Sequence, residues 1–253
     1  MREANNLLVV ASLAFASRLA LEETGLRLVL SVLLNIYAYL LNDLCDLGVD
    51  HATPHRQTDK VAFLRAHRST AIVVLAVIAA VLHGFAWLVG RAAPWPLTLF
   101  SVASSVVLVS LYSFWLKRLP IADILAMALA GATGTLLGAS FERGSWVLVG
   151  VAGLICGAYQ AVQLLRDIDV DRAQGVGTTA VVLGTTATAW ILRLLLVAGA
   201  AYGVWVVGSY WGCGLLLALV VPYRGEHAAR SWDMLRLVSG GVWLALLIEL
   251  YFA

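Results

Sequence analysis

Acidic residues interrupt an apolar chain between residues 42 and 60, which read NDLCDLGVDHATPHRQTDK. On a helix that turns about 100° per residue, Asp43, Asp46 and Asp50 lie at about 0°, 300° and 340° and therefore share one stripe. Three polar residues extend this stripe backward into the preceding apolar segment: Asn35, Tyr39 and Asn42. Clustered carboxylates without a set of His or Cys ligands favour hard cations such as Mg²⁺. The spacing predicts a cation-binding face that continues as a polar surface into a membrane-buried helix.

A second acidic cluster ends another apolar segment, where residues 160–172 read QAVQLLRDIDVDR. Three residues share a helix face with Gln160, at about 300°, 340° and 20° from it: Gln163, Asp167 and Asp171. Asp169 falls about 200° from Asp167 and is expected to point elsewhere. The second stripe thus resembles the first in its position at a helix end.

Two such stripes are suited to binding a diphosphate. The carboxylates would repel one another unless cations occupied the space between them, so a metal is expected to serve stability as well as chemistry. Magnesium, with Lys or Arg, would neutralise the diphosphate oxygens and stabilise the charge on a leaving group. Arg56 and Lys60 are close enough in sequence to hold the anionic end, whereas Arg65 and Arg68 are expected at lipid headgroups. An isoprenoid tail would run down between the helices.

The composition places these residues in an integral membrane protein. The chain has 253 residues, of which 61% are hydrophobic and 13% charged, and its mean hydropathy is +0.88, far outside the range of soluble domains. We expect one domain over residues 1–253, an all-α bundle of about nine transmembrane helices around a central cavity that opens to the cytoplasmic side. We expect no nucleic-acid partner. The apolar segments are roughly 4–21, 25–45, 70–90, 95–116, 121–140, 146–166, 187–207, 209–223 and 235–252.

Basic residues predict the orientation. They gather in the loops after the even-numbered segments: Arg56, Lys60, Arg65, Arg68, Lys117, Arg118, Arg166, Arg172, Arg224 and Arg230. By the positive-inside tendency these loops are cytoplasmic, so the N-terminus and both acidic stripes face the cytoplasm of what we expect to be a bacterial or archaeal cell.

Small residues and cysteines are expected to serve packing. Ala130, Gly134 and Gly138 recur at four-residue spacing, and Gly153 and Gly157 repeat this spacing in the next segment, as in helices that approach closely. The three cysteines are far apart and lie in apolar segments, which argues against a disulfide framework or a zinc site.

The motifs resemble those of the UbiA superfamily of intramembrane prenyltransferases. Asn42-Asp43-x-x-Asp46-x-x-x-Asp50 is similar to its NDxxDxxxD motif, and Asp167-x-x-x-Asp171 to its second DxxxD motif. Tyr112 and Lys117 are similar to its tyrosine–lysine motif, although four residues separate them here where three are usual. The number of apolar segments also matches.

The resemblance implies a Mg²⁺-dependent enzyme that ionises a prenyl diphosphate with two or more ions bound. The implied metal ligands are Asp43, Asp46, Asp50, Asp167 and Asp171. The expected catalytic residues are Asp43, Asp46, Asp167, Asp171, Tyr112 and Lys117. The expected substrate-binding residues are Asn35, Tyr39, Asn42, Arg56, Lys60, Gln160, Gln163 and Arg166. Many relatives have Arg-Pro and Ser-Gly after the first motif, where this chain has RQTDK at 56–60.

Three functions fit this pattern. The prenyl group can pass to an aromatic or other lipophilic acceptor, which is the commonest outcome in the superfamily. Some relatives resemble terpene cyclases, in which the cation is attacked by its own double bonds without an acceptor. A transporter also places acids in membrane helices, but it would need them near the bilayer midplane and not at helix ends on one side.

Overall fold

The computed structural model describes residues 4–50, 58–90, 97–223 and 228–252, with the side chains of 4, 5, 48–50, 58, 228 and 229 left aside. These ranges contain helices and no strand, as the sequence predicts. The α-helices are α1 (Ala4–Ala16), α2 (Leu21–Asp50), α3 (Thr58–Ala66), α4 (Arg68–Gly90), α5 (Leu97–Phe114), α6 (Ala122–Thr135), α7 (Arg143–Ala173), α8 (Thr179–Tyr202) and α9 (Ala228–Phe252). Short helical pieces of other types are η1 (Leu116–Arg118), η2 (Leu136–Gly138), η3 (Gly203–Val207) and η4 (Tyr210–Val220).

Six helices of the described chain are long and apolar enough to cross a membrane, and large apolar side chains are exposed on their outer surfaces. The six are Leu21–Leu47, Arg68–Gly90, Leu97–Phe114, Arg143–Ala173, Thr179–Val207 and Arg230–Phe252. Three shorter apolar helices are Asn6–Ala16, Ala122–Gly138 and Tyr210–Val220. These helices support the expected integral membrane protein, while the count of about nine spans and the cytoplasmic side of the cavity stay predictions.

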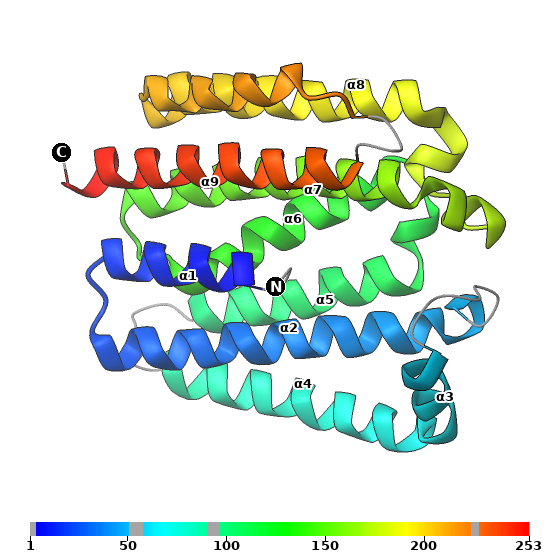
Figure 1. Ribbon diagram of the computed structural model, residues 1–253. Helices are drawn as coiled ribbons and strands as arrows, with labels where there is room; N and C mark the ends of the chain where they lie inside the picture. The colour runs from blue at the N-terminus through cyan, green and yellow to red at the C-terminus, as the bar shows by residue number, and fades with distance from the viewer. Residues whose placement is uncertain (1–3, 51–57, 91–96, 224–227, 253) are drawn as a thin grey trace.

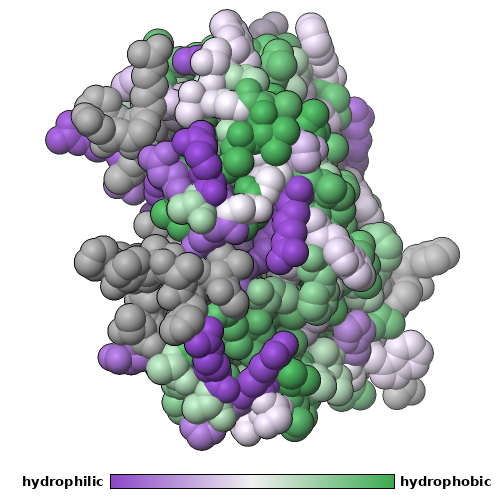
Figure 2. Space-filling model, turned by 90° about the vertical axis from the view of Figure 1, so that its right-hand side faces the viewer, coloured by the Kyte–Doolittle hydropathy of each residue, from purple (hydrophilic) through white to green (hydrophobic). Residues whose placement is uncertain are grey.

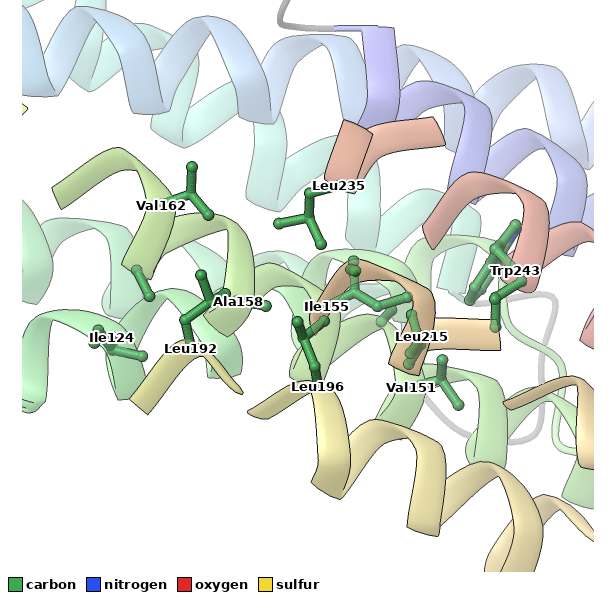
Figure 3. Close-up of a cluster of buried hydrophobic side chains, with 14 of the residues drawn as sticks. Ile124, Val151, Ile155, Ala158, Val162, Leu192, Leu196, Leu215, Leu235 and Trp243 are labelled. Atoms are coloured by element: carbon green, nitrogen blue, oxygen red, sulfur yellow. The ribbon is translucent and has the colours of Figure 1, made fainter. Parts of the chain in front are cut away.

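The long helices run side by side, and α7 lies at the centre of one half of the bundle (Figure 1). In the most apolar stretch of α7, 72% of the residues are buried, whereas in that of α4 only 11% are. Side chains of α7 such as Ile155 and Ala158 meet Leu192 and Leu196 of α8 and Leu235 of α9 (Figure 3). A helix buried on nearly every side holds its polar end in a fixed position, which matters because that end carries the second acidic cluster.

Glycines let α6 approach α7 and η2 approach α1 closely, although the sequence identifies only some of these glycines. A Cβ atom on Gly153 would lie 3.1 Å from the carbonyl oxygen of Ala128, and one on Gly138 would lie 2.4 Å from that of Val10. Gly134 faces open space, and Gly131 packs instead, with Cys156 only 2.3 Å from where its Cβ would be. The predicted four-residue stripe is therefore wrong at Gly134.

Hydrogen bonds bring the first and last helices together at the end of the bundle opposite the acidic clusters. The Ser17 hydroxyl lies 3.0 Å from that of Ser145 and 3.3 Å from the Tyr251 hydroxyl, and Trp243 Nε1 donates to Ser12 Oγ at 2.9 Å. The helix α1 ends at Ala16, earlier than the predicted residue 21, because Arg18 adopts a positive φ of 53°. The C-terminal ends of α2, α5 and α7 all lie at the other end of the bundle (Figure 1).

Candidate active site

Asp46 of α2 is held by two side chains. Lys117 of η1 forms an ion pair with Asp46 Oδ1, and Asn42 Nδ2 donates to Asp46 Oδ2 at 2.9 Å. Lys117 is 8% exposed, so its ammonium group is largely removed from water. Its ion pair with Asp46 is therefore stronger than a pair that is fully in water. Residues of the first motif and of the tyrosine–lysine pair, 71 positions apart, therefore meet at one point. Hydrophilic residues gather over this end of the molecule (Figure 2).

Asp43 forms a second ion pair. Lys60 Nζ of α3 lies 2.6 Å from Asp43 Oδ2, and the side chains are 45% and 25% exposed, respectively. Since exposed pairs are weak and easily exchanged for other partners, Lys60 can transfer from the carboxylate to an incoming anion. The predicted ligand Asp50 belongs to α2, but its side chain lies outside the described part of the protein. Arg56 lies outside the described residues altogether.

The second acidic cluster is also paired with cations. Arg166 Nε donates to Asp167 Oδ1 at 2.8 Å and its second nitrogen to Oδ2 at 2.6 Å, a bidentate geometry that fixes the carboxylate. The Arg166 guanidinium lies 5.9 Å from the ring centroid of Trp232 on α9. Asp171 Oδ2 accepts a hydrogen bond from Thr178 at 3.2 Å. Asp169 points elsewhere, in agreement with its helical angle, and pairs with Arg172 while 90% exposed.

Tyr112 connects α5 to α7. Its hydroxyl accepts a hydrogen bond from Gln160 Nε2 of α7 at 2.9 Å. This bond ties the helix that leads to Lys117 to the helix that carries the second acidic motif. Gln163, one turn further along α7, is half-buried.

A groove of about 350 Å³ begins at Asp43 and runs along α2. It is lined by Leu7, Val32, Asn35, Ile36, Tyr39, Leu40 and Asp43. The stretch of α2 that borders it, from residue 32 to residue 43, is about 16 Å long at 1.5 Å per residue. Asn35 also accepts a hydrogen bond from Asn6 at 3.5 Å. The groove joins a polar entrance to apolar walls, which suits a ligand with a charged head and a hydrocarbon tail.

The donor set fits magnesium better than a metal that needs a complete protein cage. Among the described side chains no three His, Cys, Asp or Glu residues cluster closely enough to hold a metal by themselves. Magnesium usually binds through one or two carboxylates, several waters and the phosphates of a substrate. Asp43 and Asp46 of the first motif and Asp167 and Asp171 of the second are the carboxylates that would hold such an ion.

Sequence reasoning missed Asp123, a fully buried carboxylate beside the site. It accepts hydrogen bonds from the backbone N–H of Thr179 at 2.8 Å and from the Thr179 hydroxyl. The same hydroxyl accepts from the N–H of Ile121 at 2.6 Å, whose φ is +71°. This cluster ties the segment after Lys117 to the start of α8, next to Thr178. The available signal was an acid in the first turn of a helix after Pro120.

We expect Asp123→Ala to lower the free energy of unfolding by about 2–3 kcal/mol, because buried donors on Thr179 lose their acceptor. Thermal unfolding of the purified protein in detergent measures this loss. Asp123→Asn, which keeps one acceptor oxygen, should retain part of the stability, and Asp59→Ala, which alters an exposed carboxylate of α3, should change nothing. Equal melting of the Asp59→Ala and Asp123→Ala proteins would contradict the assigned role.

Comparisons with known proteins agree with this geometry. The model of the UbiA prenyltransferase family matches residues 6–245. The chain superposes on the structure of a UbiA homologue from Archaeoglobus fulgidus bound to GPP and Mg²⁺ with a TM-score of 0.72, covering 100% of this chain and 98% of that one at 13% identity. This likeness shows the fold.

Two curated relatives have names from carotenoid metabolism. A lycopene elongase/hydratase of Haloferax volcanii is 29% identical over 188 residues, which are 71% of this chain and 59% of the relative. A C(50) beta-cyclic carotenoids biosynthesis protein of Dietzia sp. is 26% identical over 201 residues, 77% of this chain and 46% of the relative. The chain therefore spans about half the length of these relatives.

Proposed function

Because this chain belongs to the UbiA prenyltransferase family, we propose that it is a magnesium-dependent intramembrane enzyme that ionises a prenyl diphosphate and transfers the prenyl group to a lipophilic acceptor. One observation carries the proposal. A groove with apolar walls begins at Asp43, which pairs with Lys60, and the ion pair of Asp46 with Lys117 follows about one turn further along α2. The entrance suits the diphosphate and the walls suit the isoprenoid tail.

The cations of the site would receive the diphosphate oxygens. Lys117 and Lys60 leave Asp46 and Asp43 when the substrate arrives, and their ammonium groups donate to oxygens that gain negative charge as the bond breaks. Arg166 orients Asp167 through its bidentate contact before substrate binds and would then release this carboxylate to the metal. Asn42 and Gln160 orient Asp46 and Tyr112, respectively.

The carboxylates released from their cations would hold magnesium. We assign Asp43, Asp46 and Asp50 to one side and Asp167 and Asp171 to the other. When bound, the ion neutralises diphosphate oxygens and stabilises the charge on the leaving group. The cleavage breaks the bond between the allylic carbon and oxygen, and the electron pair leaves with pyrophosphate. The Tyr112 hydroxyl, which Gln160 orients by a hydrogen bond, would face the developing allylic cation, and its oxygen would stabilise that charge.

We propose that the acceptor is a long polyene hydrocarbon of the carotenoid class. The names of the two curated relatives point to this class, and the groove beside α2 offers an elongated apolar surface. A double bond of the acceptor would attack the allylic cation, forming a carbon–carbon bond, and the resulting cation would lose a proton or take up water. Tyr39 and Asn35, which line the groove about one and two turns from Asp43, would bind the substrate along its length.

Pyrophosphate release from the reconstituted protein tests the proposal. We expect release from dimethylallyl, geranyl, farnesyl or geranylgeranyl diphosphate only with Mg²⁺, and at least about a hundredfold less after chelation with EDTA. With lycopene present, mass spectrometry should find a product heavier by the prenyl unit. A cyclic hydrocarbon formed without acceptor would instead identify a terpene cyclase, and no release from any diphosphate would refute the proposed chemistry.

A further inference from the structure

A second pocket, of about 430 Å³, lies between α2, α4 and α5. Its apolar walls come from Leu41, Leu44, Ile72, Leu75 and Phe114. Cys45 also lines it, and on α2 this residue lies about 200° around the helix from Asp43. The pocket is therefore behind the acidic stripe and outside the site described above.

The hydroxyl of Ser113 in this pocket has no partner. Ser113 is 1% exposed, and its oxygen makes no hydrogen bond within the described part of the protein. Other serines of α5 satisfy their hydroxyls locally: Ser104 donates to the carbonyl of Phe100 at 2.6 Å and Ser110 to that of Val106 at 2.7 Å. Because an unsatisfied buried hydroxyl costs stability, its position on the pocket wall points to a ligand with a polar group.

Two cations of the pocket form no ion pair with the described residues. Arg68 begins α4 and Arg118 ends η1, and both line the pocket and are exposed. Neither has a carboxylate within 4 Å among the residues that the structure describes, in contrast to Lys60, Lys117 and Arg166. Two unpaired guanidinium groups beside apolar walls attract an amphiphile with an anionic head.

We propose that this pocket binds an anionic phospholipid, with its phosphate between Arg68 and Arg118 and part of an acyl chain against the leucines. The positive charges of Arg68 and Arg118 favour a lipid with an anionic headgroup. The apolar walls belong to helices that are long and apolar enough to lie in the bilayer, which selects a lipid over a free phosphate. The Ser113 hydroxyl donates to an oxygen of the glycerol ester region. The bound lipid would contact the face of α2 that lies away from Asp46 and, through Arg118, the segment that contains Lys117.

Native mass spectrometry tests this site directly. We mix the detergent-purified chain with equal amounts of dioleoylphosphatidylglycerol and dioleoylphosphatidylcholine and compare the adducts. The wild type should prefer phosphatidylglycerol, and the Arg68→Gln/Arg118→Gln double variant should bind it about tenfold to thirtyfold more weakly, from about a tenfold loss or less per cation near the headgroups. Ser113→Ala should weaken binding by a few fold.

Matched variants separate a specific site from general charge attraction. Arg230→Gln removes an exposed cation from α9, outside the pocket, and should leave the preference unchanged, while Arg68→Lys/Arg118→Lys should restore most of it. Equal binding of both lipids by the wild type, or an equal loss in Arg230→Gln, overturns the proposal. So does competition by inorganic phosphate at the concentration of the lipid. These measurements require no catalytic activity and stand apart from the proposed reaction.

Discussion

Pyrophosphate release by an Asp46→Asn variant should fall at least about a thousandfold below that of the wild type. The Asp46 carboxylate meets Lys117 and Asn42 at the centre of the first motif. The amide removes the negative charge that holds Lys117 before substrate binds and magnesium afterwards, so both neutralising groups are misplaced as the leaving group gains charge. Steady-state release with saturating prenyl diphosphate and Mg²⁺ measures the effect.

The control for this variant is Asp59→Asn, which changes an exposed carboxylate at the same end of the molecule. It should retain wild-type release. Size-exclusion profiles should be similar for all three proteins, and Asp46→Asn should melt at a lower temperature than the other two because Lys117, which is 8% exposed, loses its counterion. Wild-type rates in folded Asp46→Asn protein would remove this carboxylate from the reaction.

Asp167→Ala should also lose nearly all activity, by about a thousandfold. The substitution removes a proposed metal ligand and leaves Arg166 without its bidentate partner. The same helix offers a matched control in Asp169, which is 90% exposed and pairs with Arg172. We expect Asp169→Ala to retain activity within about twofold, because exposed ion pairs contribute little.

Comparison of the two α7 variants separates specific chemistry from the loss of negative charge near the membrane. Each removes one carboxylate from one helix, two positions apart. Similar rates in both variants would show that activity does not depend on which face of α7 carries the carboxylate. This result would contradict the assignment of Asp167 and Asp171 to the site.

The sequence predicts the polar stripes because helical spacing is a local property. Asp43, Asp46 and Asp50 all belong to α2 in the structure, and Asp169 leaves the stripe as its angle requires. The apolar segments likewise mark where helices occur, since membrane helices need long apolar runs.

Contacts between distant segments are less predictable. Asp123 and Thr179 are 56 residues apart, and the packing of both α6 and α8 against α7 brings them together. Gly131 replaces Gly134 at a close contact because the face of α6 that meets α7 depends on how the two helices pack. The segment after Ser209 forms η4, where a Cβ on Gly212 would lie 2.7 Å from Gly203 Cα. Hydropathy alone does not predict that the backbone must pass so closely at these two glycines.

The ion pairs of the acidic motifs have a consequence for how the protein is made. Lys60, Lys117 and Arg166 already balance Asp43, Asp46 and Asp167, so self-repulsion of the acids is relieved by the polypeptide itself. The newly synthesised chain can settle into the bilayer during biogenesis without waiting for an ion from the cell. Magnesium would then bind to the folded protein by replacing Lys and Arg as the partners of these carboxylates. The concentration of magnesium would change the rate of the reaction but not the amount of folded protein.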